Sequence, residues 1–495
     1  MLNLHLLYPE IGLAVFALVL LTADLFFKGG KGKFLYFLGV FSACLTLGIL
    51  GLAYSSPETY QGLGTMWTVD PLALFFKVLI LATVILVLLL SVEYKPEAAH
   101  GHLGSFSALV LLSAVGMMLL VSAVDLLLIF LALELVSISS FILVGYERKD
   151  LRSSEGAMKY FIIGAFSSAL MVYGISLFYG SMGTTRLTEI YPLFAQRSSA
   201  MFILGCLLIL VGFGFKISMA PFHLWVADAY EGAPTPVTAF LSVAPKIAGM
   251  AVLLRVFTHF VPLASLDLSH VLCFLAMLTM TVGNCTAIFQ TNVKRLLAYS
   301  SIAQAGYMLI GFVTGGILGR EGVLLYSLVY LFMNLGIFAV VIHLGNEDGY
   351  ELDAFDGLAK RDLALALLST FFLLSLAGIP PLAGFIAKFR LFQSAIQGGW
   401  YWLAVVGVLN SVISVYYYMS IAHHMFFRQP RRAEPARRGW IVTGTVALAT
   451  AAIFLFGLYP EPALSTVRLS AEILPARAAG AARAAAPSTG PALLP

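Results

Sequence analysis

The chain has 495 residues, of which 60% are hydrophobic and 11% charged, with a formal net charge of +4 and a mean hydropathy of +0.93. Soluble proteins are about 45–50% apolar and about 25% charged, so this composition excludes a soluble protein and predicts one that crosses a membrane many times. Its modest positive charge lies in the loops that flank apolar runs and does not indicate a nucleic-acid partner.

Metal and nucleotide sites have no sequence signal in this chain. The four cysteines lie in apolar segments, without a CxxC or a Cys/His cluster: Cys44, Cys206, Cys273 and Cys285. Structural zinc and iron–sulfur sites need closely spaced thiolates. The sequence has no Walker loop and no GxGxxG after a strand. We therefore expect no cofactor and no metal on this chain.

Apolar runs long enough to cross a bilayer recur along almost the whole sequence. They predict about fourteen transmembrane helices, at 6–27, 33–54, 71–92, 104–122, 124–145, 157–180, 200–227, 236–257, 270–289, 295–316, 322–344, 364–394, 400–426 and 440–460. The first run has no basic segment before it, so it predicts a helix and not a cleaved signal. The Ala/Pro-rich residues 461–495 predict a disordered tail.

Loop charges predict the orientation of the chain in the membrane. Lysine and arginine are concentrated in the loops on the same side as the first loop, which contains Lys28, Lys31 and Lys33. Such loops are cytoplasmic in most membrane proteins. This places both termini on the periplasmic side of a bacterial inner membrane.

Several ionisable residues stand inside the apolar runs, where a charge is costly and usually functional. Lys216, Lys246 and Glu134 lie well inside their predicted helices, and Lys388 lies seven residues after Pro381. The alternative for these four is a buried ion pair that only fixes helix packing, but such pairs are costly and seldom retained for stability alone. For Lys77 and Arg255, which lie nearer helix ends, we favour side chains that reach the headgroups; for Lys159 both interpretations remain open.

Prolines interrupt two of the predicted helices. Pro221 stands in the seventh helix, and Pro380 and Pro381 stand in the twelfth. A proline removes a backbone hydrogen bond, and a carbonyl freed at membrane depth needs a partner in protein or water. Because Lys216 and Lys388 lie near these two breaks, the pattern predicts polar sites there and two inverted five-helix repeats.

Three segments resemble the antiporter-like family of proton-conducting membrane subunits: KISMAPFHLWVADAYEGAPTPVTAFLS, NCTAIFQTNVKRLLAYSSIAQAGYMLIG and DGLAKRDLALALLSTFFLLSLAGIPPLAGFIAKFRLF. Within this antiporter-like family, the chain is similar to the N-type subunits of NADH–quinone oxidoreductase, which is respiratory complex I. The length, Tyr230 before EGAPTP and Lys388 in GFIAKF carry this likeness.

The resemblance implies an all-α membrane protein with five regions. These are helices 1–3 (1–100), a first repeat of helices 4–8 (101–260), a second repeat of helices 9–13 (261–430), helix 14 (431–460) and the tail (461–495). It implies a proton path in which Glu134 pairs with Lys216, Lys246 passes the proton on, and Lys388 faces the outer half-channel. His223, in the PFH motif, and Lys159 are secondary candidates.

The resemblance also implies partners. FMN, iron–sulfur clusters and quinone are expected in partner subunits: the other membrane-arm subunits (the antiporter-like M type and the small K, J and A types) and, through them, the peripheral arm. The chain would then be a translocase subunit without a redox centre. Two alternatives are a cation/proton antiporter of the Mrp type and a structural membrane subunit with an inactive channel.

Gln304 stands where many relatives have histidine, so water is expected between Lys246 and Lys388.

Overall fold

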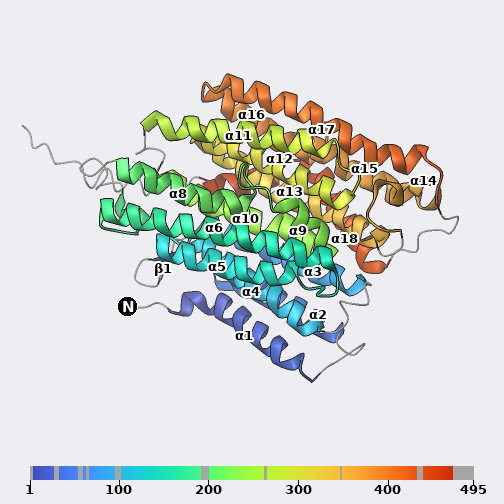
Figure 1. The fold of residues 1–495 in the computed structure, drawn as a ribbon, viewed down its shortest axis with the longest axis horizontal. Coiled ribbons are helices and arrows are strands. Elements are labelled where there is room, and N and C mark those ends of the chain that lie inside the picture. Colours follow the sequence, from blue (N-terminus) through green and yellow to red (C-terminus); the bar gives the residue numbers. More distant parts are fainter. Residues whose placement is uncertain are drawn as a thin grey trace, which may run out of the picture.

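The computed structural model describes residues 4–26, 33–53, 60–62, 66–94, 102–190, 200–260, 265–345, 348–431 and 439–471. Nearly all of these residues are helical, as predicted. The helices lie side by side along a common direction, with α1 at one edge of the bundle and α17 at the opposite edge (Figure 1). Long apolar helices pack in this way because their backbone groups are already paired within each helix.

Within the described residues, twelve helices are long and apolar enough to cross a membrane. These are α2 (Lys33–Ala53), α3 (Pro71–Glu93), α4 (Leu103–Ser122), α5 (Leu126–Val144), α6 (Leu151–Met182), α8 (Ala200–Ile217), α10 (Thr235–Phe260), α11 (Ser265–Ala287), α12 (Val293–Thr314), α13 (Ile317–Gly345), α17 (Tyr401–Phe427) and α18 (Trp440–Leu458). Two shorter apolar helices, α1 (Tyr8–Ala23) and α15 (Leu363–Ala377), correspond to the remaining predicted spans. The chain is therefore a multi-pass membrane protein.

Short elements connect the long helices. They are η1 (Leu4–Leu7), β1 (Tyr60–Gly62), β2 (Trp67–Val69), α9 (Val226–Gly232), η5 (Leu352–Phe355), α14 (Leu358–Arg361) and α16 (Ala383–Gln397). β1 and β2 form a small antiparallel hairpin, with Tyr60 opposite Val69, which the all-helical prediction did not include. The hairpin leads directly into α3, whose first turn is capped by the Asp70 side chain.

Two predicted boundaries need correction. α6 begins at Leu151, not at 157, because the Asp150 side chain accepts a hydrogen bond from the backbone N–H of Arg152. The predicted tail is wrong in its first part. Residues 461–471 are helical, and one face of this helix, which includes Leu464 and Val467, is buried. The rest of the predicted tail, 472–495, lies outside the described residues.

The seventh predicted helix is broken where the sequence predicted it. α8 ends at Ile217 and α9 begins at Val226. Ser218 has a φ of 65°, a left-handed conformation that ends a helix. The freed backbone finds a partner across the bundle, because the N–H of Ala220 donates to Thr279 Oγ1 of α11 at 3.1 Å.

The twelfth predicted helix is broken in the same way, between α15 and α16. Gly378 has a φ of 87° and ends α15, a conformation that glycine adopts without steric cost. The two halves then approach closely: a Cβ at Gly384 would lie 1.8 Å from the carbonyl oxygen of Ser375. The two breaks support the predicted pair of repeats; the repeats and their boundaries remain a prediction.

Candidate functional site

Three lysines lie buried inside the helical bundle. Lys216 stands in the last turn of α8, Lys246 in α10 and Lys388 in α16. Their exposed fractions are 2%, 1% and 3%. Among the residues that the structure describes, none of the three forms an ion pair; each donates to hydroxyl or carbonyl oxygens instead. An ammonium held only by neutral oxygens at membrane depth can lose its proton without leaving an unpaired carboxylate behind.

Lys216 and Glu134 do not form the direct pair that was predicted. Lys216 Nζ donates to Ser137 Oγ of α5 at 3.2 Å, whereas Glu134, half-buried on the same helix, accepts a hydrogen bond from Ser168 of α6. Ser137 follows Glu134 by three residues and so shares its helix face. The ammonium and the carboxylate thus each have a serine partner of their own.

Lys246 connects α10 to α12. Its Nζ donates to Ser301 Oγ at 2.6 Å and lies 5.7 Å from the centre of the Tyr230 ring. The negative face of an aromatic ring favours a nearby cation. Lys216 approaches this site from α8, because a Cβ at Gly249, one turn after Lys246, would lie 3.9 Å from Lys216 Cγ.

A belt of buried hydroxyl and amide groups lies between Lys246 and Lys388. Ser300, beside Ser301, shares a hydrogen bond with the Tyr418 hydroxyl at 2.5 Å. Gln304 Nε2 donates to the same hydroxyl at 3.0 Å, and Tyr326 donates to Gln304 Oε1. Gln304 therefore fills part of the space that was predicted to hold water, and it both donates and accepts there.

The belt continues to Lys388. Its Nζ lies 4.2 Å from the centre of the Tyr307 ring, and the Tyr307 hydroxyl accepts from Asn284 at 3.2 Å. Lys388 Nζ also donates to the carbonyl oxygen of Ala377 at 3.0 Å and to Ser411 Oγ at 3.3 Å. Ala377 is the last residue of α15, so Lys388 satisfies a carbonyl that the helix break sets free.

Among the described residues, neither secondary candidate forms a hydrogen bond or an ion pair with a buried lysine. His223 stands half-buried in the segment between α8 and α9. The Lys159 side chain is 44% exposed and forms ion pairs with Glu155 and Asp228, both at 2.7 Å. Lys159 belongs to a cluster of opposite charges, and the structure does not bring it to Lys246 or Lys388.

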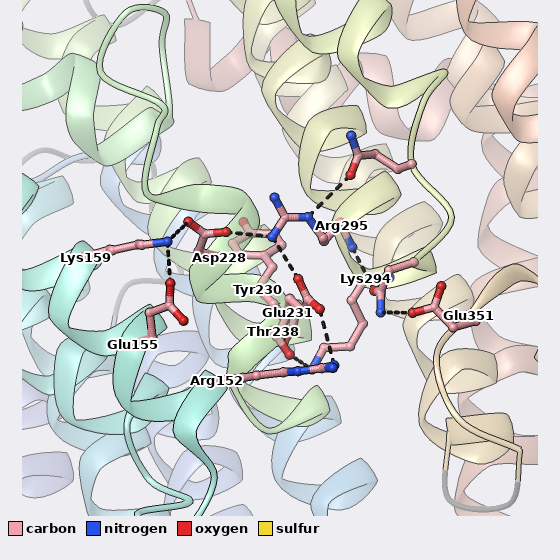
Figure 2. A network of polar contacts seen from close by, with 12 residues as sticks. Arg152, Glu155, Lys159, Asp228, Tyr230, Glu231, Thr238, Lys294, Arg295 and Glu351 are labelled. Atoms are coloured by element: carbon pink, nitrogen blue, oxygen red, sulfur yellow. Dashed lines mark hydrogen bonds and ion pairs between the residues drawn. The ribbon is translucent and has the colours of Figure 1, made fainter.

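This charged cluster surrounds α9 (Figure 2). Asp228 of α9 contacts Lys159 of α6 on one side and Arg295 of α12 on the other, at 2.7 and 2.6 Å. Glu231 of α9 contacts Arg295 at 2.8 Å and Arg152 of α6 at 3.4 Å. Arg152, Asp228, Glu231 and Arg295 border a hollow of about 230 Å³. α9, which also contains Tyr230, is thus clamped between two membrane helices.

Asp228 lies in α9, a short helix that is not among the twelve candidate spans. Neighbouring charges determine the pKa of its carboxyl group. Burial by itself raises the pKa of Asp228, but hydrogen bonds from Lys159 and Arg295 outweigh it and hold that pKa below its usual range. Lys294 adds a further clamp, because its buried Nζ donates to the backbone oxygens of Glu231 and Ala233 at 2.7 and 2.6 Å. A cation at the end of α9 also complements the helix dipole.

We expect Arg295→Gln to loosen α9, because the change removes two ion pairs from one guanidinium. The measurement is hydrogen exchange of the backbone amides of 226–233, which should become faster. Arg152→Gln is the control: Arg152 is 71% exposed and its contact with Glu231 is longer, and exposed pairs contribute only about 0–1 kcal/mol. Equal exchange in both variants would show that Arg295 does not hold α9.

Two further cations are buried, contrary to the prediction that they reach the headgroups. Lys77 is fully buried and pairs with Glu10 of α1 at 2.6 Å. Arg255 is buried and donates to both carboxylate oxygens of Asp70 and to the carbonyl oxygen of Val121. Their partners come from other helices, so only the packing of these helices could reveal the pairs.

Comparison with known proteins agrees with this architecture. Residues 123–414 match the sequence profile of the family described as NADH:quinone oxidoreductase/Mrp antiporter, transmembrane. The chain belongs to this family. A curated relative from Trichlorobacter lovleyi, named NADH-quinone oxidoreductase subunit N, is 42% identical over 90% of this chain and 92% of its own length.

Solved structures of the antiporter-like family have the same fold. A chain of respiratory complex I from Thermus thermophilus is 32% identical, with a TM-score of 0.79 over 93% of this chain and 99% of its own. A chain of the Mrp complex from Dietzia sp. is 19% identical, with a TM-score of 0.80 over 95% and 99%, and shows the fold alone. The predicted family and fold class are confirmed.

Proposed function

We propose that the chain is a proton-conducting membrane-arm subunit of an NADH–quinone oxidoreductase complex. The observation that carries the proposal is the set of three buried lysines that form no ion pair among the described residues, two of them with buried hydroxyl and amide groups lying between them. Groups of this kind can accept and donate protons in turn. The relatives named as subunit N of this complex support the same assignment.

The proposed path starts at Lys216 and Glu134. Burial disfavours the charged ammonium, and a nearby carboxylate favours it. If Glu134 moved from Ser168 toward Lys216, the lysine would hold its proton; if it moved away, the lysine would release it to Lys246. Protons would enter from the cytoplasmic side near Lys216 and leave past Lys388. Moving one charge against 100 mV costs about 2.3 kcal/mol, which a single buried charge contact can supply.

The driving energy must come from other subunits. FMN, iron–sulfur clusters and quinone would be bound there, and oxidation of NADH and reduction of quinone would take place there. The described residues contain no group of three or more His, Cys, Asp or Glu side chains that could hold a metal ion. We place the complex in the bacterial inner membrane, with this chain beside other antiporter-like and small membrane-arm subunits.

The test is proton translocation by the purified complex in sealed vesicles, driven by NADH and a quinone. We expect Lys216→Met and Glu134→Gln to lower translocation at least about tenfold, because each removes a group that holds or controls the proton. Lys360→Gln is the control, since Lys360 lies at a helix end and bonds to Gln429. Full translocation in both variants would refute the path. Proton release that depends on Na⁺ or K⁺ instead of NADH would favour an Mrp-type antiporter.

A further inference from the structure

A second buried pair of ionisable groups lies outside the part of the chain that matches the family profile, 123–414. Glu10 in the first turn of α1 and Lys77 in α3 are 2% and 0% exposed. Lys77 Nζ lies 2.6 Å from Glu10 Oε1 and 4.7 Å from the centre of the Trp67 ring. An acid, a base and an indole are thus brought together from α1, α3 and β2.

Within the described part of the chain, several hydrogen-bonding groups of these three residues have no protein partner. The Glu10–Lys77 contact is an ion pair but does not have the geometry of a hydrogen bond. Both carboxylate oxygens, Lys77 Nζ and Trp67 Nε1 are buried without a hydrogen-bond partner among the described residues. Buried polar groups are nearly always hydrogen-bonded to protein or to ordered water. Several such groups at one place fit a water molecule, which makes about three hydrogen bonds when buried.

The neighbouring pair, Asp70 and Arg255, shows what a structural ion pair looks like in this protein. Arg255 donates to both oxygens of Asp70, at 2.8 and 2.9 Å, and to the carbonyl oxygen of Val121. Asp70 also accepts from the N–H of Ala73 at 2.8 Å. A guanidinium does not release its proton in proteins. This pair can therefore fix α3 against α10, but it cannot exchange protons.

The Glu10–Lys77 pair differs from the Asp70–Arg255 pair in two ways. A carboxylate and an ammonium can both become neutral by proton transfer, and the polar atoms of Glu10 and Lys77 can still form hydrogen bonds with water. α3 is also held against the helix that contains Lys246. Asp70 precedes Lys77 by seven residues, about 10 Å along the helix and on the same face. The Asp70 partner, Arg255, stands on α10, the helix that also contains Lys246.

We propose that Glu10, Lys77 and Trp67 form a second proton-exchange site, which binds water. A proton passes from the Lys77 ammonium to the Glu10 carboxylate: an N–H bond breaks, an O–H bond forms, and the ion pair becomes an amine and a carboxylic acid. The net charge does not change, so the step requires no oxidant, reductant or counterion. Bound water then exchanges the proton with the surroundings. The inference rests on the proposed function, that the chain conducts protons.

The experiment compares variants of the complete complex in sealed vesicles. Glu10→Gln/Lys77→Met removes both charges and leaves side chains of similar size, so a purely structural pair should tolerate it. We expect the double variant to assemble and to oxidise NADH normally. Its translocated protons per electron pair should fall at least about twofold, because a proton-exchanging group is lost. Unchanged translocation would overturn the inference. If Lys216→Met also left translocation unchanged, the proposed function itself would fail.

If the variants do not assemble, a second measurement tests the proposed proton-exchange site in the unmodified complex. Infrared difference spectra of the unmodified complex, recorded with and without NADH in H₂O and D₂O, should contain a protonated-carboxyl band that shifts on deuteration. The assignment uses glutamate labelled with ¹³C. A high-resolution map should also show water between Glu10 and Trp67 Nε1. A dry site without an exchangeable carboxyl band would overturn the inference.

Discussion

Lys246→Arg should abolish proton translocation while the complex still assembles. Arginine retains the positive charge next to Ser301 and Tyr230, the two groups that contact Lys246. A guanidinium cannot release its proton in a protein, so it can replace the charge of lysine but not its proton transfer. Because Lys246 has no acidic partner among the described residues that could take over its role, we expect translocation to fall at least about tenfold.

Two further variants separate proton transfer from packing at this position. Lys246→Met removes the charge and should stop translocation to the same extent. Ser301→Ala removes only the acceptor of the 2.6 Å hydrogen bond and should have a smaller effect, since water can take the place of a hydroxyl. The measurement is proton uptake into vesicles at equal NADH oxidation. Normal uptake by Lys246→Arg would show that Lys246 acts as a fixed charge and does not carry the proton.

Arg255→Met should destabilise the protein more than any of the other substitutions considered. It leaves the Asp70 carboxylate buried and without its bidentate partner, and breaking a buried pair in this way costs about 3–5 kcal/mol. The measurement is the midpoint of thermal unfolding of the purified complex in detergent. We expect a clear fall in that midpoint and a lower yield of assembled complex.

The control is Arg186→Met, which breaks an ion pair between Arg186 and Glu189 whose side chains are 44% and 45% exposed. Exposed pairs contribute about 0–1 kcal/mol, so this variant should unfold close to the unmodified protein. Arg255→Met/Asp70→Asn should recover part of the loss, because no unpaired carboxylate remains. Equal midpoints for Arg255→Met and Arg186→Met would show that the buried pair contributes nothing to stability.

The sequence by itself determined the fold class, most of the helices and both breaks. Length and apolar content identify a spanning helix without reference to any neighbour, because the bilayer is the solvent for each helix separately. Proline acts locally too, so Pro221 and Pro381 predicted the ends of α8 and α15. Lys216 and Lys246 were singled out because they lie deep in apolar runs, and Lys388 because it follows the predicted helix break at Pro381.

Only the tertiary structure decided which groups each charge meets. Lys77 and Arg255 lie near helix ends, where reaching the headgroups is possible, yet Glu10 and Asp70 from distant segments hold them inside. Glu134 and Lys216 were predicted to pair, but Glu134 accepts from Ser168 and Lys216 donates to Ser137. Tyr307, Tyr326 and Tyr418 have the sequence pattern of packing aromatics and nevertheless place their hydroxyls along the polar belt. Contacts of this kind depend on how helices face one another, which local periodicity does not encode.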